Sequence, residues 1–430
     1  MSGLVLFSLV LGLSPRLADG STPVSFRNEV MAVLSKAGCN LGTCHGNARG
    51  KGGFQLSLRG QDPESDYLTI TRDWLSRRSN VTEPDHSLLL LKPTMQLAHE
   101  GGQRFAISST EYMILRDWIS AGMPADGREV PRLTGLDVSP DRQILESPEW
   151  TVSLTVRARF SDGSVRNVNR FAVYEVGTPI VEVSPEGEVR GESAGETVIL
   201  VRYLDRQVPV PLAFVPARPE FVWKSPQSNN LIDRFVFEKL RDLKLEPSDV
   251  CDDTTFLRRA YFDLIGTLPT ASEARAFVVD RSSDKRERLI DELLNRPEYA
   301  DWWALKWADM LRVEEKTLDG KGTAVFHAWL RSAMADDKPL DQLVHELIAS
   351  RGSTYSEPPA NFYRALRDPF ARAEAVGQLF LGVRLQCAKC HNHPFDRWTQ
   401  DDYYAWGNVF ARVDYKILEN QRRDQNDSHE

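Results

Sequence analysis

Hydrophobic residues follow three successive patterns along the 430-residue chain. Over residues 21–127 they recur every three or four positions, the spacing of amphipathic helices. Over residues 132–216 they alternate with polar residues, which is typical of half-buried strands. The helical spacing returns over residues 222–416, and residues 417–430 are polar. The pattern predicts a multidomain protein with an all-α region, a β-sandwich, a mostly α-helical C-terminal region and a polar tail.

Local signals mark where several of these elements begin or turn. Ser108 stands three residues before Glu111, and Thr270 stands three residues before Glu273. A hydroxyl followed at this spacing by glutamate is typical of a capping box at the start of a helix. The dipeptide Asp-Gly at 162–163 separates two alternating segments and predicts a tight hairpin turn.

Residues 1–20 combine an apolar stretch with small residues at its end. Residues 4–13 have about the length of a signal-peptide core and are short for a membrane span. Ala18 and Gly20 suit cleavage, although no Lys or Arg precedes the apolar stretch. We therefore expect a signal peptide over residues 1–20. The mature protein should be periplasmic or secreted and should lack a transmembrane segment.

Composition and charge narrow the classes of function. The chain is 41% hydrophobic and 27% charged, and its formal net charge is −8. Binding of nucleic acid needs clustered Lys and Arg, and the sequence shows no such cluster. We therefore expect no nucleic-acid partner. Four of the five cysteines fall in two close pairs, and each pair is followed directly by a histidine.

The C-terminal pair has the spacing of a haem-attachment motif. Cys387, Cys390 and His391 form the pattern C-x-x-C-H, in which two sulfurs bond the porphyrin and the histidine ligates the iron. A zinc site that adds His393 to these three residues is one alternative, and a disulfide between the cysteines is another. A disulfide gives no reason for the histidine that follows.

The N-terminal pair has the same order of residues with a longer spacing. Four residues separate Cys39 from Cys44, and His45 follows at once. The additional residues must loop out, and Gly42 makes such a loop easy to form. The sequence therefore predicts one haem c at Cys39, Cys44 and His45, and a possible second haem c at the C-terminal motif.

A haem that transfers electrons needs a second axial ligand. For the first haem the candidates include His99, which we favour, and Met95, which would raise the reduction potential relative to two histidines. For the second haem His327 comes first, although it lies on an apolar helical stripe where an ordinary core histidine is equally expected. An iron without this ligand would suit chemistry on peroxide or small ligands.

Three parts of the chain resemble known domain families in a fixed order. Residues 26–73 and 87–105 include the segments CNLGTCHGNARGKGGF and KPTMQLAHEGGQRF, and they look like the planctomycete-type cytochrome c domain. Residues 132–216 resemble the bacterial Ig-like group 2 domain. The C-terminal region resembles the domain of unknown function that is fused to those cytochromes. The resemblance rests on the segments NNLIDRFVFEKL, FLRRAYFDLIGTLPT and LQCAKCHNHPFDRW.

The resemblance carries expectations for individual residues. It implies haem c on Cys39, Cys44 and His45. The family usually shows a His-x-Gly-Gly step, which here begins at His99 and supports that residue as the axial ligand. The resemblance gives the C-terminal motif no settled role. Such proteins usually continue into a further domain, so we expect this chain to be a truncated or split form.

The sequence favours an exported multidomain c-type cytochrome that passes electrons to a redox partner protein. One alternative is a di-haem, peroxidase-like enzyme with one open iron. Another is a non-redox protein of the cell surface that binds polysaccharide or another surface ligand through its Ig-like domain, with zinc or disulfides at the cysteines. Whether the protein is an enzyme stays open, because fold alone does not determine function.

Overall fold

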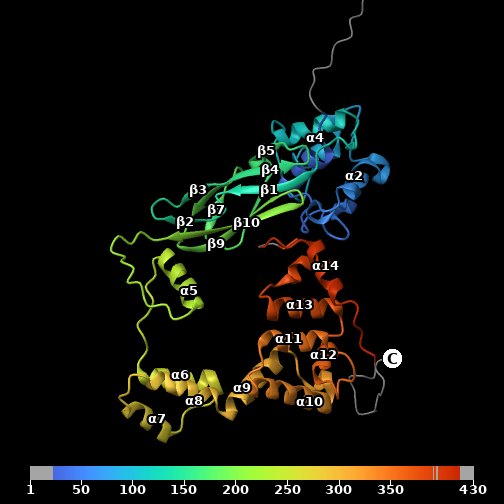
Figure 1. Cartoon of the computed structure of the whole chain (residues 1–430). Helices are drawn as coiled ribbons and strands as arrows, with labels where there is room; N and C mark the ends of the chain where they lie inside the picture. The colour runs from blue at the N-terminus through green and yellow to red at the C-terminus, as the bar shows by residue number, and fades with distance from the viewer. Residues whose placement is uncertain (1–22, 391, 394–395, 417–430) are drawn as a thin grey trace, which may run out of the picture. The chain divides into compact units, whose positions relative to one another are not determined.

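The computed structural model describes residues 23–390, 392–393 and 396–416. The predicted signal peptide, the polar tail and His391 lie outside these residues. The chain divides into two compact units, Met1–Phe214 and Val215–Glu430. We describe each unit by itself (Figure 1).

The first unit begins with helices, and the described residues 23–131 contain no strand. Their core is formed by α1 and α4, where Trp118 is fully buried and its ring centre lies 5.3 Å from that of Phe26. The helices are η1 (Phe26–Val30), α1 (Met31–Lys36), η2 (Lys51–Gly53), η3 (Leu58–Gly60), α2 (Pro63–Thr71), η4 (Asp73–Ser76), η5 (Pro84–His86), α3 (Leu88–Leu91) and α4 (Thr110–Ser120).

The start of α4 corrects one detail of the predicted capping. The N-cap residue is Ser109, whose side chain accepts a hydrogen bond from the backbone N–H of Tyr112. The capping box predicted from Ser108 is therefore wrong by one residue. Two serines stand side by side here, and the one that caps is the one whose hydroxyl reaches a free N–H group of the first turn.

Strands make up the rest of the first unit. They form three sheets with the orders β1-β4-β5, β2-β10-β9-β6 and β3-β8-β7, and the hairpin of β9 and β10 is antiparallel. The strands are β1 (Leu133–Ser139), β2 (Gln143–Glu146), β3 (Thr151–Ser153), β4 (Thr155–Phe160), β5 (Val165–Asn167), β6 (Val173–Val176), β7 (Val181–Val183), β8 (Glu188–Gly191), β9 (Gly195–Tyr203) and β10 (Arg206–Val215), and η6 is Asn169–Phe171.

The strands surround one hydrophobic core. Alternate residues of β4 point into it, because Val156, Ala158 and Phe160 are buried while their neighbours are exposed. The antiparallel pair β4–β5 turns at residues 162–163, where Gly163 has a φ of 81°. The hairpin turn predicted from the sequence is therefore confirmed.

The strands also hold the helix that leads to the first cysteine. The ammonium group of Lys36, at the end of α1, donates to the carbonyl oxygens of Ala172 and Pro185 at 2.6 and 2.7 Å. The hydroxyl of Tyr203 donates to the carbonyl oxygen of Asn28 at 3.0 Å. These contacts fix α1, and therefore the residues that follow it, against the sheets.

The second unit is helical, and its described residues after Val215 contain no strand. The capping box predicted at Thr270 and Glu273 is present at the start of α7. The helices are α5 (Leu231–Asp242), α6 (Asp253–Ile265), α7 (Ala271–Val279), α8 (Lys285–Leu294), α9 (Pro297–Met310), α10 (Glu315–Ala335), α11 (Leu340–Ala349), η7 (Pro358–Ala360), α12 (Asn361–Ala365), α13 (Pro369–Phe380), η8 (Leu385–Lys389) and α14 (Gln400–Val409).

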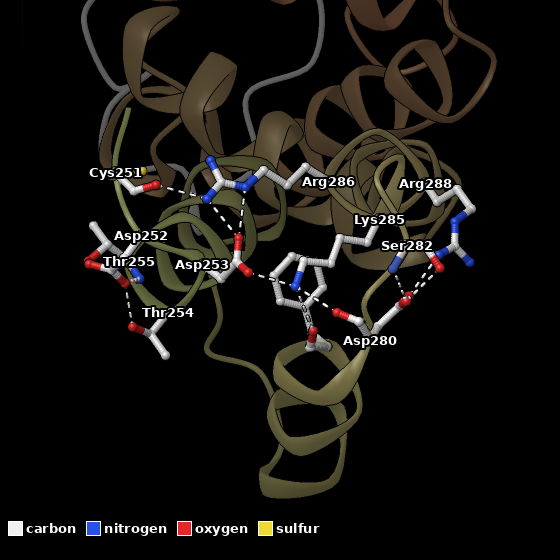
Figure 2. Close-up of polar contacts among 11 residues, drawn as sticks. Cys251, Asp252, Asp253, Thr254, Thr255, Asp280, Ser282, Lys285, Arg286 and Arg288 are labelled. Atoms are coloured by element: carbon white, nitrogen blue, oxygen red, sulfur yellow. Dashed lines mark hydrogen bonds and ion pairs between the residues drawn. The ribbon is translucent and has the colours of Figure 1, made fainter. Parts of the chain in front are cut away.

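Polar side chains tie the ends of these helices together. At the start of α6, the carboxylate of Asp253 forms ion pairs with Lys285 and Arg286 of α8, at 2.6 and 2.7 Å (Figure 2). Arg286 also donates to the carbonyl oxygen of Cys251 at 2.8 Å. These contacts pair the charged groups at the ends of α6 and α8 with each other.

The structure supports the predicted architecture at a coarse level. The N-terminal unit contains helices and antiparallel strands, and the C-terminal unit is helical, as expected for a multidomain chain. Among the described residues, no helix is both long enough and apolar enough to cross a membrane.

Candidate functional site

A cavity of about 840 Å³ opens among the helices of the first unit. It brings together residues that are far apart in the sequence, namely the first cysteine–histidine group and the segment around residue 99. Its walls include the apolar side chains of Leu34, Phe54, Leu88, Leu89, Phe105 and Leu115 and the candidate ligands Cys39, Cys44, His45, Met95 and His99.

The glycines after the first motif let the chain fold tightly around His45. A Cβ atom on Gly46 would overlap the carbonyl group of Asn40, and one on Gly50 would overlap the carbonyl group of Phe54. Gly50 also has a φ of 61°, a backbone angle that residues other than glycine rarely adopt. Gly46 and Gly50 are therefore required by close backbone approaches beside the motif.

This tight loop supplies hydrogen-bond acceptors for the His45 ring. Nδ1 of His45 lies 3.1 Å from the carbonyl oxygen of Lys51 and 3.1 Å from that of Phe54. A carbonyl can only accept, so Nδ1 carries the proton and Nε2 keeps its lone pair. Burial lowers the pKa of the His45 imidazole, while its two bonds to carbonyl oxygens act in the opposite direction. The ring is thus held with Nε2 available as a ligand.

His99 is held in the same way on the other side of the cavity. Its Nδ1 lies 2.9 Å from the carbonyl oxygen of Gly102, which again leaves Nε2 available. A Cβ atom on Gly101 would lie 2.8 Å from Cε1 of His99, so only glycine leaves room for the ring in this position. Gly102 has a φ of 71°, a value that favours glycine.

The two histidine rings face each other at a distance that suits one metal ion. Their ring centres lie 6.3 Å apart and their planes differ by 16°. Bonds from a metal to imidazole nitrogen are about 2 Å long, and each nitrogen lies about 1 Å from the centre of its ring. An ion between two imidazoles therefore separates the ring centres by about 6 Å. The observed separation is close to this value, and the two rings are nearly parallel.

The alternative axial ligand is less well placed. Met95 lines the cavity, but 48% of its surface is exposed to solvent. His99 is the residue that lies opposite His45 with its second nitrogen fixed. Both residues line the cavity, and the choice of His99 as axial ligand stays a prediction.

Both cysteines of the first motif reach the same cavity as free thiols. Burial raises the pKa of the Cys39 thiol to about 12, an effect that the positive charge of Arg104 partly opposes. Nη2 of Arg104 lies 3.5 Å from Sγ of Cys44. Two thiols and two imidazoles around one cavity could hold a planar metal cofactor by four attachment points.

Cationic side chains also line the cavity, and sequence reasoning missed them. The one carboxylate among the lining residues is that of Glu100, and the cations are Lys51, Arg77, Arg78, Lys92 and Arg104. No motif marks these residues, because they come from four separate segments. Arg104 could have been suspected, since it follows the His-x-Gly-Gly step by two residues.

The second motif has different surroundings. Cys387 lies in the short helix η8 and is half-buried, whereas Cys390 is exposed. His391 lies outside the described residues. Nε2 of His393 lies 3.1 Å from the carbonyl oxygen of Arg384 and is therefore occupied by a backbone contact. The described cysteines of this motif are free thiols.

His327 is not brought to the second motif. It lies in the middle of α10, next to Phe326 in the largest hydrophobic cluster of the second unit. The described part of the motif packs in another cluster, formed by Leu385, Ala388 and Tyr403 with neighbouring aromatic side chains. His327 is itself half-buried, and with His391 outside the described residues its role as a ligand stays a prediction.

Within the described residues, no group of three or more His, Cys, Asp or Glu side chains is arranged to hold a metal ion. A haem does not require such a group, because the porphyrin supplies four of the iron's ligands. The zinc alternative at the second motif needs His391 and stays open for that reason.

The comparisons with known proteins concern the second unit. Residues 231–415 match the family described as PSCyt2, protein of unknown function (DUF1549), which is the planctomycete cytochrome-associated domain. This agrees with the resemblance predicted for the C-terminal region. No curated protein matches the chain significantly.

Proposed function

We propose that this chain is an exported c-type cytochrome that carries electrons through a haem in its N-terminal unit. Cys39 and Cys44 would anchor the haem, and His45 and His99 would ligate its iron. The haem supplies reversible one-electron transfer when it is bound. The residues of the chain hold the two imidazoles in place and surround them with apolar side chains.

The observation that carries this proposal is the pair of histidines. Their ring centres are 6.3 Å apart, and in each ring Nδ1 meets a backbone carbonyl. A histidine that ligates a metal through one nitrogen usually donates its other N–H group to an acceptor of this kind. Two such histidines line a cavity that also contains two thiols. This set of side chains is better explained by a bound haem c than by a purely structural role in the core.

The size and lining of the cavity agree with a cofactor of this class. Its volume of about 840 Å³ is within the range of sites for cofactors and small molecules. The apolar walls exclude water, and a site of low polarity makes the iron potential sensitive to nearby charges. The fixed rings need little rearrangement when the oxidation state changes, which favours fast electron transfer.

We also propose a fold family for each part of the first unit. We assign residues 23–127 to a cytochrome c-like domain, because helices surround the cavity that contains the motif. We assign residues 132–216 to an Ig-like β-sandwich, because its sheets share one core. The bonds of Lys36 to the sandwich favour a supporting role for it beside the cytochrome.

For the second unit we propose a second haem at Cys387, Cys390 and His391. The support is the spacing of the motif together with the match to a cytochrome-associated family. The partner of the whole chain would then be a redox protein outside the cytoplasm.

The optical spectrum of the full chain tests the assignment of the axial ligands. The protein is made with haem-maturation machinery in a Cys387→Ala/Cys390→Ala background, so that only the first site contributes. Two histidine ligands predict a low-spin ferric spectrum. His99→Ala should keep the covalent haem but become high-spin and bind added imidazole.

Met95→Leu is the matched control, because Met95 lines the same cavity. It should leave the spectrum unchanged. A switch to high spin in Met95→Leu, with none in His99→Ala, would move the axial ligand to Met95. A folded wild-type chain without covalent haem would overturn the proposal as a whole.

A further inference from the structure

One cation of the cavity wall is buried without a carboxylate partner. Arg78 has only 8% of its surface exposed, and it lines the cavity beside Phe54. Its guanidinium donates to the carbonyl oxygens of Thr69 and Gly53 at 3.3 and 3.0 Å and lies 4.6 Å from the centre of the Phe54 ring. Within the described part of the chain, no Asp or Glu forms an ion pair with it.

A buried guanidinium of this kind calls for a counter-charge. Moving a charge out of water is costly unless the charge is paired, and two carbonyl groups and an aromatic face neutralise none of it. The hydrogen bonds to these carbonyl oxygens use two of the five N–H donors of Arg78 and hold its guanidinium group in one place. The carboxylate of Asp73 acts on this charge from beyond ion-pair distance. The protein therefore contributes a fixed cation, and a directly paired anion would come from the cavity.

The other cations of the cavity do not share this position. Arg104 lies beside Sγ of Cys44, which is where the cofactor would be anchored. Lys92 donates to the carbonyl oxygen of Ala98 and is exposed. Arg77 precedes Arg78 and also lines the cavity, although its side chain is exposed. Arg78 is the buried, fixed member, and Arg77 adds a second positive charge beside it.

We propose that Arg78 binds a carboxylate of the ligand that fills this cavity. The planar fork of arginine fits a carboxylate through paired hydrogen bonds, which lysine cannot do as well. The inference rests on the proposed function, because a haem carries two carboxylates on its periphery. Arg78 would therefore orient the haem from the edge away from the cysteines, and it would neutralise one of the haem's negative charges.

This pairing has a measurable effect on the iron. A negative charge near the iron favours the ferric state, and a neighbouring cation cancels that charge. Without Arg78 the carboxylate stays unpaired, so the reduction potential should fall. A fall of about 59 mV corresponds to a tenfold change in the equilibrium constant for one electron.

The test uses the full chain with haem attached, in the Cys387→Ala/Cys390→Ala background. Haem per chain and reduction potential are measured for the wild type, Arg78→Gln and Arg78→Lys. We expect equal haem content, about a tenfold change in the equilibrium constant for Arg78→Gln, and a smaller change for Arg78→Lys. Arg72→Gln is the matched control, because Arg72 is exposed and does not line the cavity, and its potential should stay at the wild-type value.

The resonance Raman band of the haem carboxylates gives a second readout that does not depend on stability. It should shift in Arg78→Lys, which keeps the charge and is the variant better able to fold.

If haem is attached and neither the potential nor this band changes, the role of Arg78 is overturned while the cytochrome proposal stands. A folded wild-type chain without haem overturns both proposals. If the wild-type potential changes with added succinate, Arg78 binds a carboxylate from solution, and the assignment to haem is overturned.

Discussion

The two cysteine–histidine groups of this protein look alike in sequence and differ in their surroundings. The group at Cys39 and Cys44 opens into a cavity and faces a second histidine whose Nδ1 is fixed. The group at Cys387 and Cys390 lies on a short helix, and one of its cysteines is exposed. Among the described residues, the less regular motif is the one that lines a cavity together with a second histidine.

The difference shows which residues build a site of this kind. A motif supplies the anchors, but the opposite face of the cavity comes from residues about 55 positions later, around His99. The glycines on either side of the cavity allow both rings to approach the ligand position. Beside the second motif, Nε2 of the described His393 meets the carbonyl oxygen of Arg384 at 3.1 Å.

The largest effect is expected from a side chain at Gly50. Gly50→Ala would overlap the carbonyl group of Phe54 in addition to adopting a positive φ, and we expect a loss of several kcal/mol, about 3–5, in the free energy of unfolding. Urea unfolding of the first unit measures it. Gly52→Ala is the matched control, because its φ is also 61° but nothing lies near its Cβ position, so it should lose only about 1 kcal/mol. Equal losses in the two variants would show that the close approach does not matter.

The stability of the second unit should depend on a buried arginine. The guanidinium of Arg372 is fully buried and donates to the carbonyl oxygens of Leu366, Phe410 and Val413 at 2.6, 3.1 and 2.6 Å. Arg372→Met leaves these acceptors unpaired, and we expect a loss of about 3 kcal/mol in stability. Urea unfolding followed by the tryptophans of the second unit measures it. The haem spectrum of the first site should not change, and a change there would mean that the two sites are not independent.

A smaller and more local effect is expected at the axial ligand. Gly101→Ala places a methyl group 2.8 Å from the present position of Cε1 of His99, so the ring must shift. The ferric spectrum should become a mixture of low-spin and high-spin forms, with haem still attached. Gly122→Ala is a control for general destabilisation of the unit, because its φ of 85° strains the backbone while nothing lies near its Cβ position, and its spectrum should stay low-spin. An unchanged spectrum in Gly101→Ala would contradict the place given to His99.

The smallest effect concerns the segment that follows the glycine loop. Asp66 accepts hydrogen bonds from the N–H and hydroxyl groups of Ser57, both at 2.6 Å, and burial raises its pKa to about 6. A carboxyl group whose pKa is raised on folding binds more protons in the folded state between about pH 4 and pH 6. Its contribution to stability is therefore greatest at low pH and is lost as the pH rises through about 6. Asp66→Asn should remove a slope of at most about 1.4 kcal/mol per pH unit from the unfolding free energy. Identical slopes in the two proteins would contradict the raised pKa.

The sequence predicted much of the local structure. The turn at Gly163 and the cap at Thr270 depend on a few neighbouring residues, and both are present. The cap at Ser108 was wrong because adjacent serines offer the same signal, and tertiary packing decides where α4 begins. The choice of His99 followed from a family pattern and agrees with the geometry of the ring pair.

Long-range features could not be predicted in the same way. Arg78 enters the cavity because Thr69 and Gly53, from different segments, offer carbonyl groups to its side chain. His327 lies in a segment with the hydrophobic periodicity of a buried helix, but the sequence does not show which other segment this residue contacts. Periodicity shows which face of a helix is buried but not which other segment covers it.

The central claim is that the first motif, and not only the more regular second one, holds a covalent haem. Haem per chain from the reduced pyridine haemochrome spectrum tests it directly, on the wild type, on Cys39→Ala/Cys44→Ala and on Cys387→Ala/Cys390→Ala. We predict that the first double variant loses one haem per chain, and that the second variant retains a haem with the low-spin spectrum of two histidine ligands. A wild-type haem content in Cys39→Ala/Cys44→Ala would contradict the account.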